Sequence, residues 1–109
     1  MTTSYKVLGQ SNPSATTATN LYTVPAATET IVSTITVANQ AATAGTYRVA
    51  VRPNGDVLAA KHYVAYDISL PANTTDTLTL GVTLDATDII TIYASSANFS
   101  FNAFGSEIA

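Results

Sequence analysis

Hydrophobic and polar positions alternate with a period of two along most of this chain. The clearest case is the segment from Thr77 to Leu84, where Leu78, Leu80 and Val82 alternate with threonines and a glycine. A period of two places successive side chains on opposite faces of a strand, so one face is dry and the other is wet. Glu29–Asn39 has the same period and is dense in β-branched residues, which favour a pleated strand over a helix. The pattern predicts a β protein.

Turn-forming residues divide the chain into about eight short strands, with turn signals at intervals of about 8–12 residues and no convincing helix. The predicted strands are Ser4–Leu8, Leu21–Val24, Glu29–Asn39, Thr46–Arg52, His62–Leu70 with a bulge near Asp67, Leu78–Leu84, Ile89–Ala94 and a last strand opened by Phe99. This spacing is typical of an all-β, antiparallel β-sandwich, either jelly-roll or immunoglobulin-like in topology. A length of 109 residues with no internal boundary predicts a single domain over residues 1–109.

Four segments carry more specific expectations. Leu78–Phe104 contains three predicted strands joined by polar turns, which predicts a β-meander with inward apolar rows. Gly9–Asn20 is poor in large apolar residues and rich in Ser, Thr and Asn, so we expect residues 9–20 to form a loop or an arm. Pro53–Asp56 is predicted to be a hairpin-type turn, because its glycine accepts a positive φ. Gly105–Ala109 is expected to be a tail.

The composition narrows the function. Charged residues make up 10% of the chain and hydrophobic residues 47%, while the polar remainder is mostly Thr, Ser and Asn; such a surface suits a protein packed among neighbours. Four cations at a net charge of −3 are too few to follow a phosphate backbone, so we expect no nucleic-acid binding. The chain has no cysteine, which excludes disulfides and thiolate sites. No apolar run has the length of a signal peptide or a membrane span, so we expect synthesis in the cytoplasm and no membrane insertion.

Residues with catalytic potential are few and isolated. His62 is the single histidine, and nothing in the sequence selects the partners that a catalytic triad needs, so an exposed or hydrogen-bonded side chain is expected. Asp85 and Asp88 bracket a turn, but the segment lacks the carboxylate run and the glycine of a calcium loop, so turn capping is favoured. We therefore predict no enzyme activity, no metal and no cofactor. The six tyrosines are expected in the core or at its rim, with sugar binding as the rival interpretation.

Three features predict an interaction surface. Arg48 and Arg52 lie on the same face of one strand, where they could contact an acidic neighbour or form cross-strand pairs. Ile89 and Tyr93 lie opposite a buried row and would leave an exposed apolar strip. The arm could reach over an adjacent subunit and become ordered there. The predicted interface comprises Ile89, Tyr93, Arg48, Arg52, Ser11, Asn12 and Pro13.

Five segments together resemble a class of small virion structural proteins from tailed bacteriophages, including phages of cyanobacteria. They are Leu21–Ala26 (LYTVPA), Ile31–Asn39 (IVSTITVAN), Tyr47–Val51 (YRVAV), Leu84–Ala94 (LDATDIITIYA) and Phe99–Ile108 (FSFNAFGSEI). The likeness covers nearly the whole chain from Leu21 onward, and its motifs are structural. In those relatives a glycine usually precedes the aspartate that Asp88 matches; Thr87 takes its place here, which affects the type of turn.

The resemblance implies a non-enzymatic virion protein that decorates (cements) the shell in many copies. Its partners would be the major capsid protein or other virion proteins, and the chain would form a homo-oligomer, a dimer or a trimer. The localisation would be the virion, after synthesis in the host cytoplasm. The alternative is a tail, neck or fibre component with a carbohydrate- or receptor-binding role.

Overall fold

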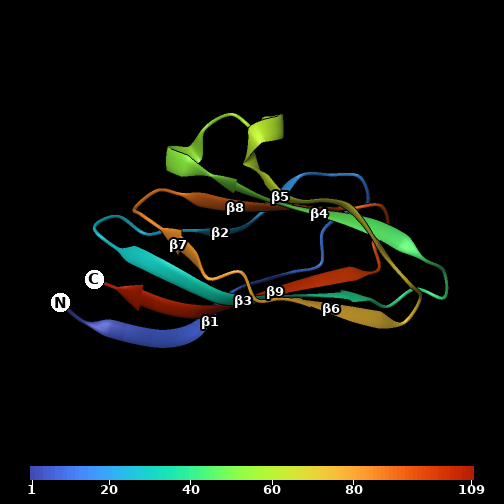
Figure 1. Cartoon of the computed structure of the whole chain (residues 1–109), viewed down its shortest axis with the longest axis horizontal. Coiled ribbons are helices and arrows are strands. Elements are labelled where there is room, and N and C mark those ends of the chain that lie inside the picture. Colours follow the sequence, from blue (N-terminus) through green and yellow to red (C-terminus); the bar gives the residue numbers. More distant parts are fainter.

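The computed structural model describes residues 1–109 and is built of nine strands (Figure 1). The strands are β1 (Thr3–Ser11), β2 (Thr19–Thr23), β3 (Glu29–Asn39), β4 (Gly45–Arg52), β5 (Tyr63–Leu70), β6 (Thr74–Leu78), β7 (Val82–Leu84), β8 (Ile89–Ala94) and β9 (Phe99–Ile108). Two 3-10 turns, η1 (Pro53–Gly55) and η2 (Ala60–His62), lie in the connection between β4 and β5. The all-β prediction is confirmed, and β3 and β8 have the predicted bounds.

The strands form two antiparallel sheets packed face to face. One sheet has the order β1-β9-β3-β6, with β7 also paired to β3, and the other has the order β2-β8-β4-β5. β6 and β7 pair with successive parts of β3, so they act as one interrupted strand. Counted in this way, eight strands follow the order of a jelly roll, in which the chain passes repeatedly between the two sheets. The strand order therefore decides between the two topologies that the sequence left open.

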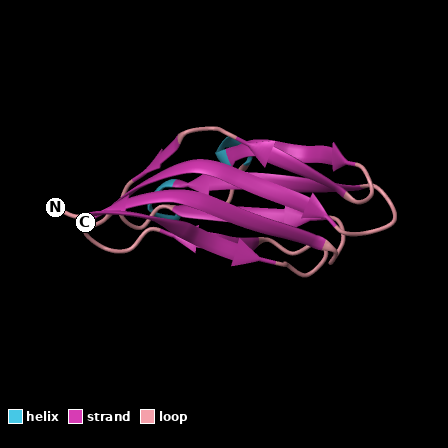
Figure 2. Ribbon diagram, turned by 90° about the horizontal axis from the view of Figure 1, so that it is seen from below, coloured by secondary structure: helices cyan, strands magenta, loops and turns pink.

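The sandwich is elongated, with extents of 45 × 27 × 20 Å. Its two termini lie together at one end (Figure 2), where the backbone amides of Thr2 and Ala109 each donate to the other residue's carbonyl oxygen. The connection between β4 and β5 rises above the four-stranded sheet (Figure 1). Each sheet has one face toward the core and one outer face, and the two outer faces lie on opposite sides of the molecule.

The core lies between the sheets and is centred on three aromatic side chains. Tyr47, Phe99 and Phe101 are fully buried, and the Tyr47 ring lies 6.5 Å from the Phe99 ring and 6.2 Å from the Phe101 ring. The Tyr47 hydroxyl donates to Asp76 Oδ2 at 2.8 Å, so its one polar atom is satisfied at the rim. Burial and this contact with a carboxylate raise the pKa of Tyr47 well above its ordinary value.

A bulge in β3 changes which residues of that strand face the core. Thr30 and Val32 are buried before the bulge, and Ile35 and Val37 are buried after it, because the pairing with β9 shifts between Val32 and Thr34. A strict period of two cannot show this change of face, since one extra residue reverses the alternation.

The predicted meander over Leu78–Phe104 is wrong. β7 pairs with β3, β8 lies in the opposite sheet, and β9 returns to lie between β1 and β3. The three strands follow one another in sequence, but none of them pairs with another of the three. The polar turns between them are crossings from one sheet to the other rather than hairpins.

The single strand predicted over Leu78–Leu84 is interrupted. β6 ends at Leu78 and β7 begins at Val82, and Gly81 between them has a φ of 63°, which is the left-handed conformation that glycine adopts readily. Leu80, predicted to face inward, is 48% exposed. The alternation of residue types continues through residues 79–81, where the strand is interrupted.

The predicted tail is wrong, and the loop predicted over residues 9–20 is confirmed only for residues 12–18. Residues 9–11 belong to β1 and residues 19–20 to β2, and in the connection between them the Thr16 amide donates to the Ala94 carbonyl oxygen at 2.8 Å. Gly105 to Ile108 form the second half of β9 and pair with both β1 and β3. Both segments are poor in large apolar residues, and pairing to neighbouring backbone orders them instead.

Candidate functional site

Arg48 lies at the centre of an aromatic cluster on the outer face of the four-stranded sheet. It is paired across the sheet with Tyr93, and its guanidinium carbon lies 4.2 Å from the centre of the Tyr93 ring and 4.3 Å from that of Tyr66. The Tyr63 ring centre is 6.0 Å away. Such distances allow cation–π attraction, which holds the aromatic rings in place on this face. We call Arg48, Tyr63, Tyr66, Tyr93 and Asp67 the tyrosine cluster.

A bulge in β5 brings Asp67 into this cluster. The pairing of β5 with β4 shifts opposite Arg48, which confirms the predicted bulge near Asp67, and Asp67 has a φ of 50°. Arg48 Nε donates to Asp67 Oδ1 at 2.6 Å, and Arg48 Nη2 donates to Asp67 Oδ2 at 3.3 Å. The hydrogen bonds to Asp67 raise the pKa of Arg48 further above its already high value. The cluster therefore contains an ion pair with no net charge.

A hollow of about 580 Å³ opens beside the cluster. It is lined by Tyr63 and Tyr66 of β5 and by Leu58, Ala59 and Ala60 of the connection between β4 and β5. The two rings meet edge to face, with their centres 4.9 Å apart and their planes at 78°. The hollow therefore has apolar walls and lies next to a polar ion pair.

His62 fixes the turn that forms one wall of this hollow. The side chain is buried, and its Nδ1 accepts a hydrogen bond from the Ala59 amide at 3.0 Å, so the neutral ring carries its proton on Nε2. Nε2 is buried without a hydrogen-bond partner, and Asp56 Oδ2 lies 3.9 Å from it. The predicted hydrogen-bonded side chain is confirmed at Nδ1.

The structure places the four predicted interface residues of β4 and β8 in two cross-strand pairs, Arg48 with Tyr93 and Arg52 with Ile89. None of the four is fully exposed. Arg52 donates to the carbonyl oxygens of Gly55 and Asp56 and to the side chains of Asn20 and Thr91. The predicted open apolar strip is therefore wrong, because the arginines and the turn after β4 cover it.

Ser11, Asn12 and Pro13 lie apart from this face, at the end of β1. Pro13 is buried. Asn12 Nδ2 donates to the carbonyl oxygens of Ala97 at 2.9 Å and Phe99 at 2.5 Å. These contacts tie the segment to its own chain, so it is not available to reach over a neighbouring subunit.

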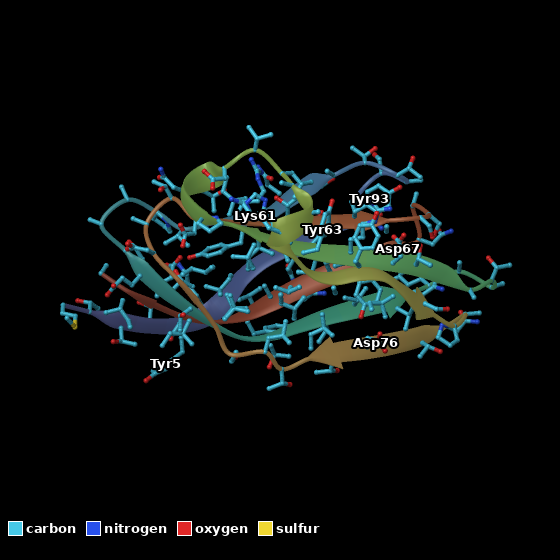
Figure 3. The ribbon with its side chains drawn as sticks, turned by 45° about the horizontal axis from the view of Figure 1, so that its top comes forward. Tyr5, Lys61, Tyr63, Asp67, Asp76 and Tyr93 are labelled. Atoms are coloured by element: carbon cyan, nitrogen blue, oxygen red, sulfur yellow. The ribbon has the colours of Figure 1, made fainter.

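A second exposed apolar surface lies on the outer face of the five-stranded sheet. Tyr5 is 85% exposed, Val7 49% and Ile31 42%. Tyr5 and Ile31 are aligned on either side of Ser106 in β9, and Val7 is paired with Phe104. Tyr5, Ile31 and Phe104 border a shallow hollow. We call Tyr5, Val7, Ile31 and Phe104 the β1 patch; Tyr5 lies on the opposite side of the sandwich from Tyr63 and Tyr93 (Figure 3).

The β1 patch was missed in the sequence because only strand pairing assembles it. Its members come from β1, β3 and β9, which are far apart in the chain. The one available signal was the alternation of Tyr5 and Val7 with Lys6, which places both apolar side chains on one face of the strand.

The carboxylates in the turn before β8 have a structural role. Asp88 Oδ2 accepts from the Asp85 amide at 2.8 Å, and Asp88 Oδ1 accepts from the Asn54 amide at 2.8 Å. Turn capping, as predicted, is confirmed for Asp88. No three of the protein's histidine and carboxylate side chains form a group that could hold a metal ion.

A polar network closes the edge of the sandwich between β1 and β2. The Tyr22 hydroxyl donates to Glu107 Oε2, and Lys6 Nζ forms an ion pair with Glu107 Oε1. The contacts with Lys6 and Tyr22 lower the pKa of Glu107, and burial together with Glu107 raises the pKa of Tyr22 to about 12. Thr30 Oγ1 lies 2.8 Å from the same hydroxyl, so the network links four strands, β1, β2, β3 and β9.

Comparisons with protein families, with curated proteins and with solved structures found no match to this chain. The structure holds no helix with the length and hydropathy that crossing a bilayer requires. The protein is a jelly-roll sandwich with two exposed apolar surfaces on opposite faces, the hollow beside Tyr66 and the β1 patch.

Proposed function

We propose that this chain is a non-enzymatic structural protein of a virus particle that decorates and stabilises the shell in many copies. The observation that carries the proposal is the β1 patch, which exposes Tyr5, Val7 and Ile31 side by side on one face. An exposed apolar patch of this kind is typical of a surface that binds another protein.

The surroundings of the β1 patch suit attachment. Ser33 and Ser106 border the hollow between its members, and hydroxyls can hydrogen-bond a partner without the cost of burying an ion. The one charge at its border, Lys6, is already paired with Glu107. β1 is also the edge strand of its sheet, so its outer backbone groups can pair with a strand of a partner.

The partner in this proposal is the major capsid protein or another virion protein, and the chain attaches as a homo-oligomer, a dimer or a trimer, after synthesis in the host cytoplasm. A modest contact per copy is sufficient, because joined copies on a repeating lattice raise the effective strength of attachment. The jelly-roll topology is consistent with this, since capsid domains commonly use it; that support is fold-level analogy.

The test is binding of the purified protein to particles that lack it, with the bound copies counted and resistance to heat measured. Val7→Asp should abolish saturable binding, because it places a carboxylate in the β1 patch. Val64→Asp is the matched control, since Val64 has the same 49% exposure but lies in β5 of the other sheet. Equal binding by both variants would contradict attachment through the β1 patch.

The receptor-binding alternative is favoured by a different observation, the tyrosine-lined hollow beside β5. Attachment through the β1 patch would leave that hollow facing away from the shell, because the two lie on opposite faces of the sandwich. The two functions can therefore belong to one chain.

A further inference from the structure

We propose that the hollow beside Tyr66 binds an uncharged saccharide, with one apolar face of the sugar ring stacked on an aromatic side chain. This inference rests on the receptor-binding function proposed above and names the class of ligand for the same hollow, on the sheet that the β1 patch does not use. Its basis is the geometry of the tyrosine cluster, its charge and the way in which the rings are held.

The aromatic surface is open to a ligand. Tyr66 is 55% exposed although it packs against both Arg48 and Tyr63. With Leu58 and the alanines of the adjoining connection it lines an open hollow of about 580 Å³. All five lining residues are apolar or aromatic, and the Arg48–Asp67 ion pair adjoins the hollow through Tyr66, whose ring centre lies 4.3 Å from the guanidinium carbon. An aromatic wall beside an ion pair fits a ligand that has both a C–H face and hydroxyl groups.

The charges of the cluster favour a neutral ligand. Arg48 and Asp67 neutralise each other through two hydrogen bonds. A free anion would compete with Asp67 for the guanidinium, and a free cation would have to compete with Arg48. Sugar hydroxyls avoid both conflicts, because each can donate to the carboxylate and accept from the guanidinium. The Asp67 side chain is 44% exposed and that of Arg48 23%, so both groups remain accessible from solvent.

The site is held in shape before any ligand arrives. Arg48 lies over the Tyr66 and Tyr93 rings at 4.3 and 4.2 Å, which limits their rotation. Ala59, which also lines the hollow, is held by the hydrogen bond that its amide donates to His62 Nδ1. Binding then orders few side chains, and a small ligand can be held without a large entropic cost.

The experiment uses saturation-transfer NMR on the whole chain with uncharged hexoses and their disaccharides as probes, and with sialic acid as the anionic comparison. We expect transfer to the C–H face of at least one neutral sugar, with affinity in the millimolar range. Tyr66→Ala should weaken binding about tenfold, which is the upper end expected for one aromatic stack. Tyr66→Phe should keep it, because the ring and not the hydroxyl supplies the stacking face.

Tyr5→Ala is the matched control, since Tyr5 is an 85% exposed tyrosine on the opposite sheet, and it should leave the saccharide signals unchanged. Unchanged thermal unfolding of Tyr66→Ala will show that loss of binding is not loss of fold. The proposal is overturned if no neutral sugar gives transfer, if only sialic acid does, or if Tyr66→Ala and Tyr5→Ala behave alike. These measurements need no particle, so their outcome is independent of the test of shell attachment.

Discussion

Substitution of Gly105 by alanine should destabilise the fold severely, although only four residues follow it in the sequence given. A Cβ added at Gly105 would lie 2.0 Å from the Ile31 carbonyl oxygen and 3.0 Å from the Val32 Cα. Both are backbone atoms within the sheet, so they cannot rotate away as a flexible side chain would. Overpacking in a core typically costs about 1–3 kcal/mol, and we expect at least about 3 kcal/mol here because the ladder between β3 and β9 must shift. Total stabilities are about 5–15 kcal/mol.

The assay is thermal unfolding followed by circular dichroism, in which a loss of about 3 kcal/mol lowers the midpoint by roughly 12–24 °C for a domain of this size. Gly81→Ala is the matched control, because Gly81 has a φ of 63° but nothing within 4 Å of an added Cβ. It should cost only the strain of a left-handed alanine, about 1–2 kcal/mol. If Gly105→Ala shifts the midpoint no more than Gly81→Ala does, the second half of β9 is not paired as described.

Three further predictions concern the core and the edge network. The pKa of Tyr22 is raised from 10 to about 12, so its contribution to the free energy of unfolding is complete below pH 10 and is lost as the pH rises toward 12. In the wild type this loss should amount to about 2–3 kcal/mol, and Tyr22→Phe should abolish it. Val82→Asp should destabilise far more than Thr83→Asp in denaturant unfolding, because Val82 packs against the core and Thr83 is exposed; equal midpoints would show that the register of β7 is wrong. Asn39→Ala should cost about 2–3 kcal/mol in the same assay, since the buried amide bonds three backbone carbonyl oxygens and the Ala41 amide; an unchanged midpoint would mean that water replaces those bonds.

The local character of the chain was predictable, and its pairing was not. β-branched alternation gave β3 and β8 their bounds, and the short polar interruption near Asp67 gave the bulge in β5, because these features depend on a few neighbouring residues. The crossing of the chain between sheets depends on contacts between residues far apart in sequence. Alternation carries no information about which strands pair, so a meander and a jelly roll have the same hydrophobic pattern in the sequence.

For the candidate surfaces, too, the face of a single strand was predictable from the sequence and the neighbouring strands were not. Ile89 and Tyr93 do lie on the face opposite the buried row of β8, but the sequence could not show that Arg48 and Arg52 would cover them, since that requires β4 beside β8. The tyrosine cluster depends on a cross-strand pair and on a bulge, and the β1 patch depends on three strands. Low hydrophobicity is shared by loops and by strands held through backbone pairing, so it cannot show that residues 9–11 and 105–108 belong to strands.

The two proposed surfaces make a joint prediction that neither makes alone. The β1 patch and the tyrosine cluster lie on opposite faces of one sandwich (Figure 3), so a partner on one face leaves the other free, and substitutions on the two faces should act independently. Val7→Asp should abolish binding to particles and leave saccharide affinity unchanged, whereas Tyr66→Ala should weaken saccharide affinity about tenfold and leave the number of bound copies unchanged. Decorated particles should in addition bind a saccharide-coated surface more tightly than the free protein does, because many copies face the same surface at once. If Val7→Asp and Tyr66→Ala each impair both activities, the two faces are not separate sites, and the assignment of attachment to one sheet and saccharide binding to the other is wrong.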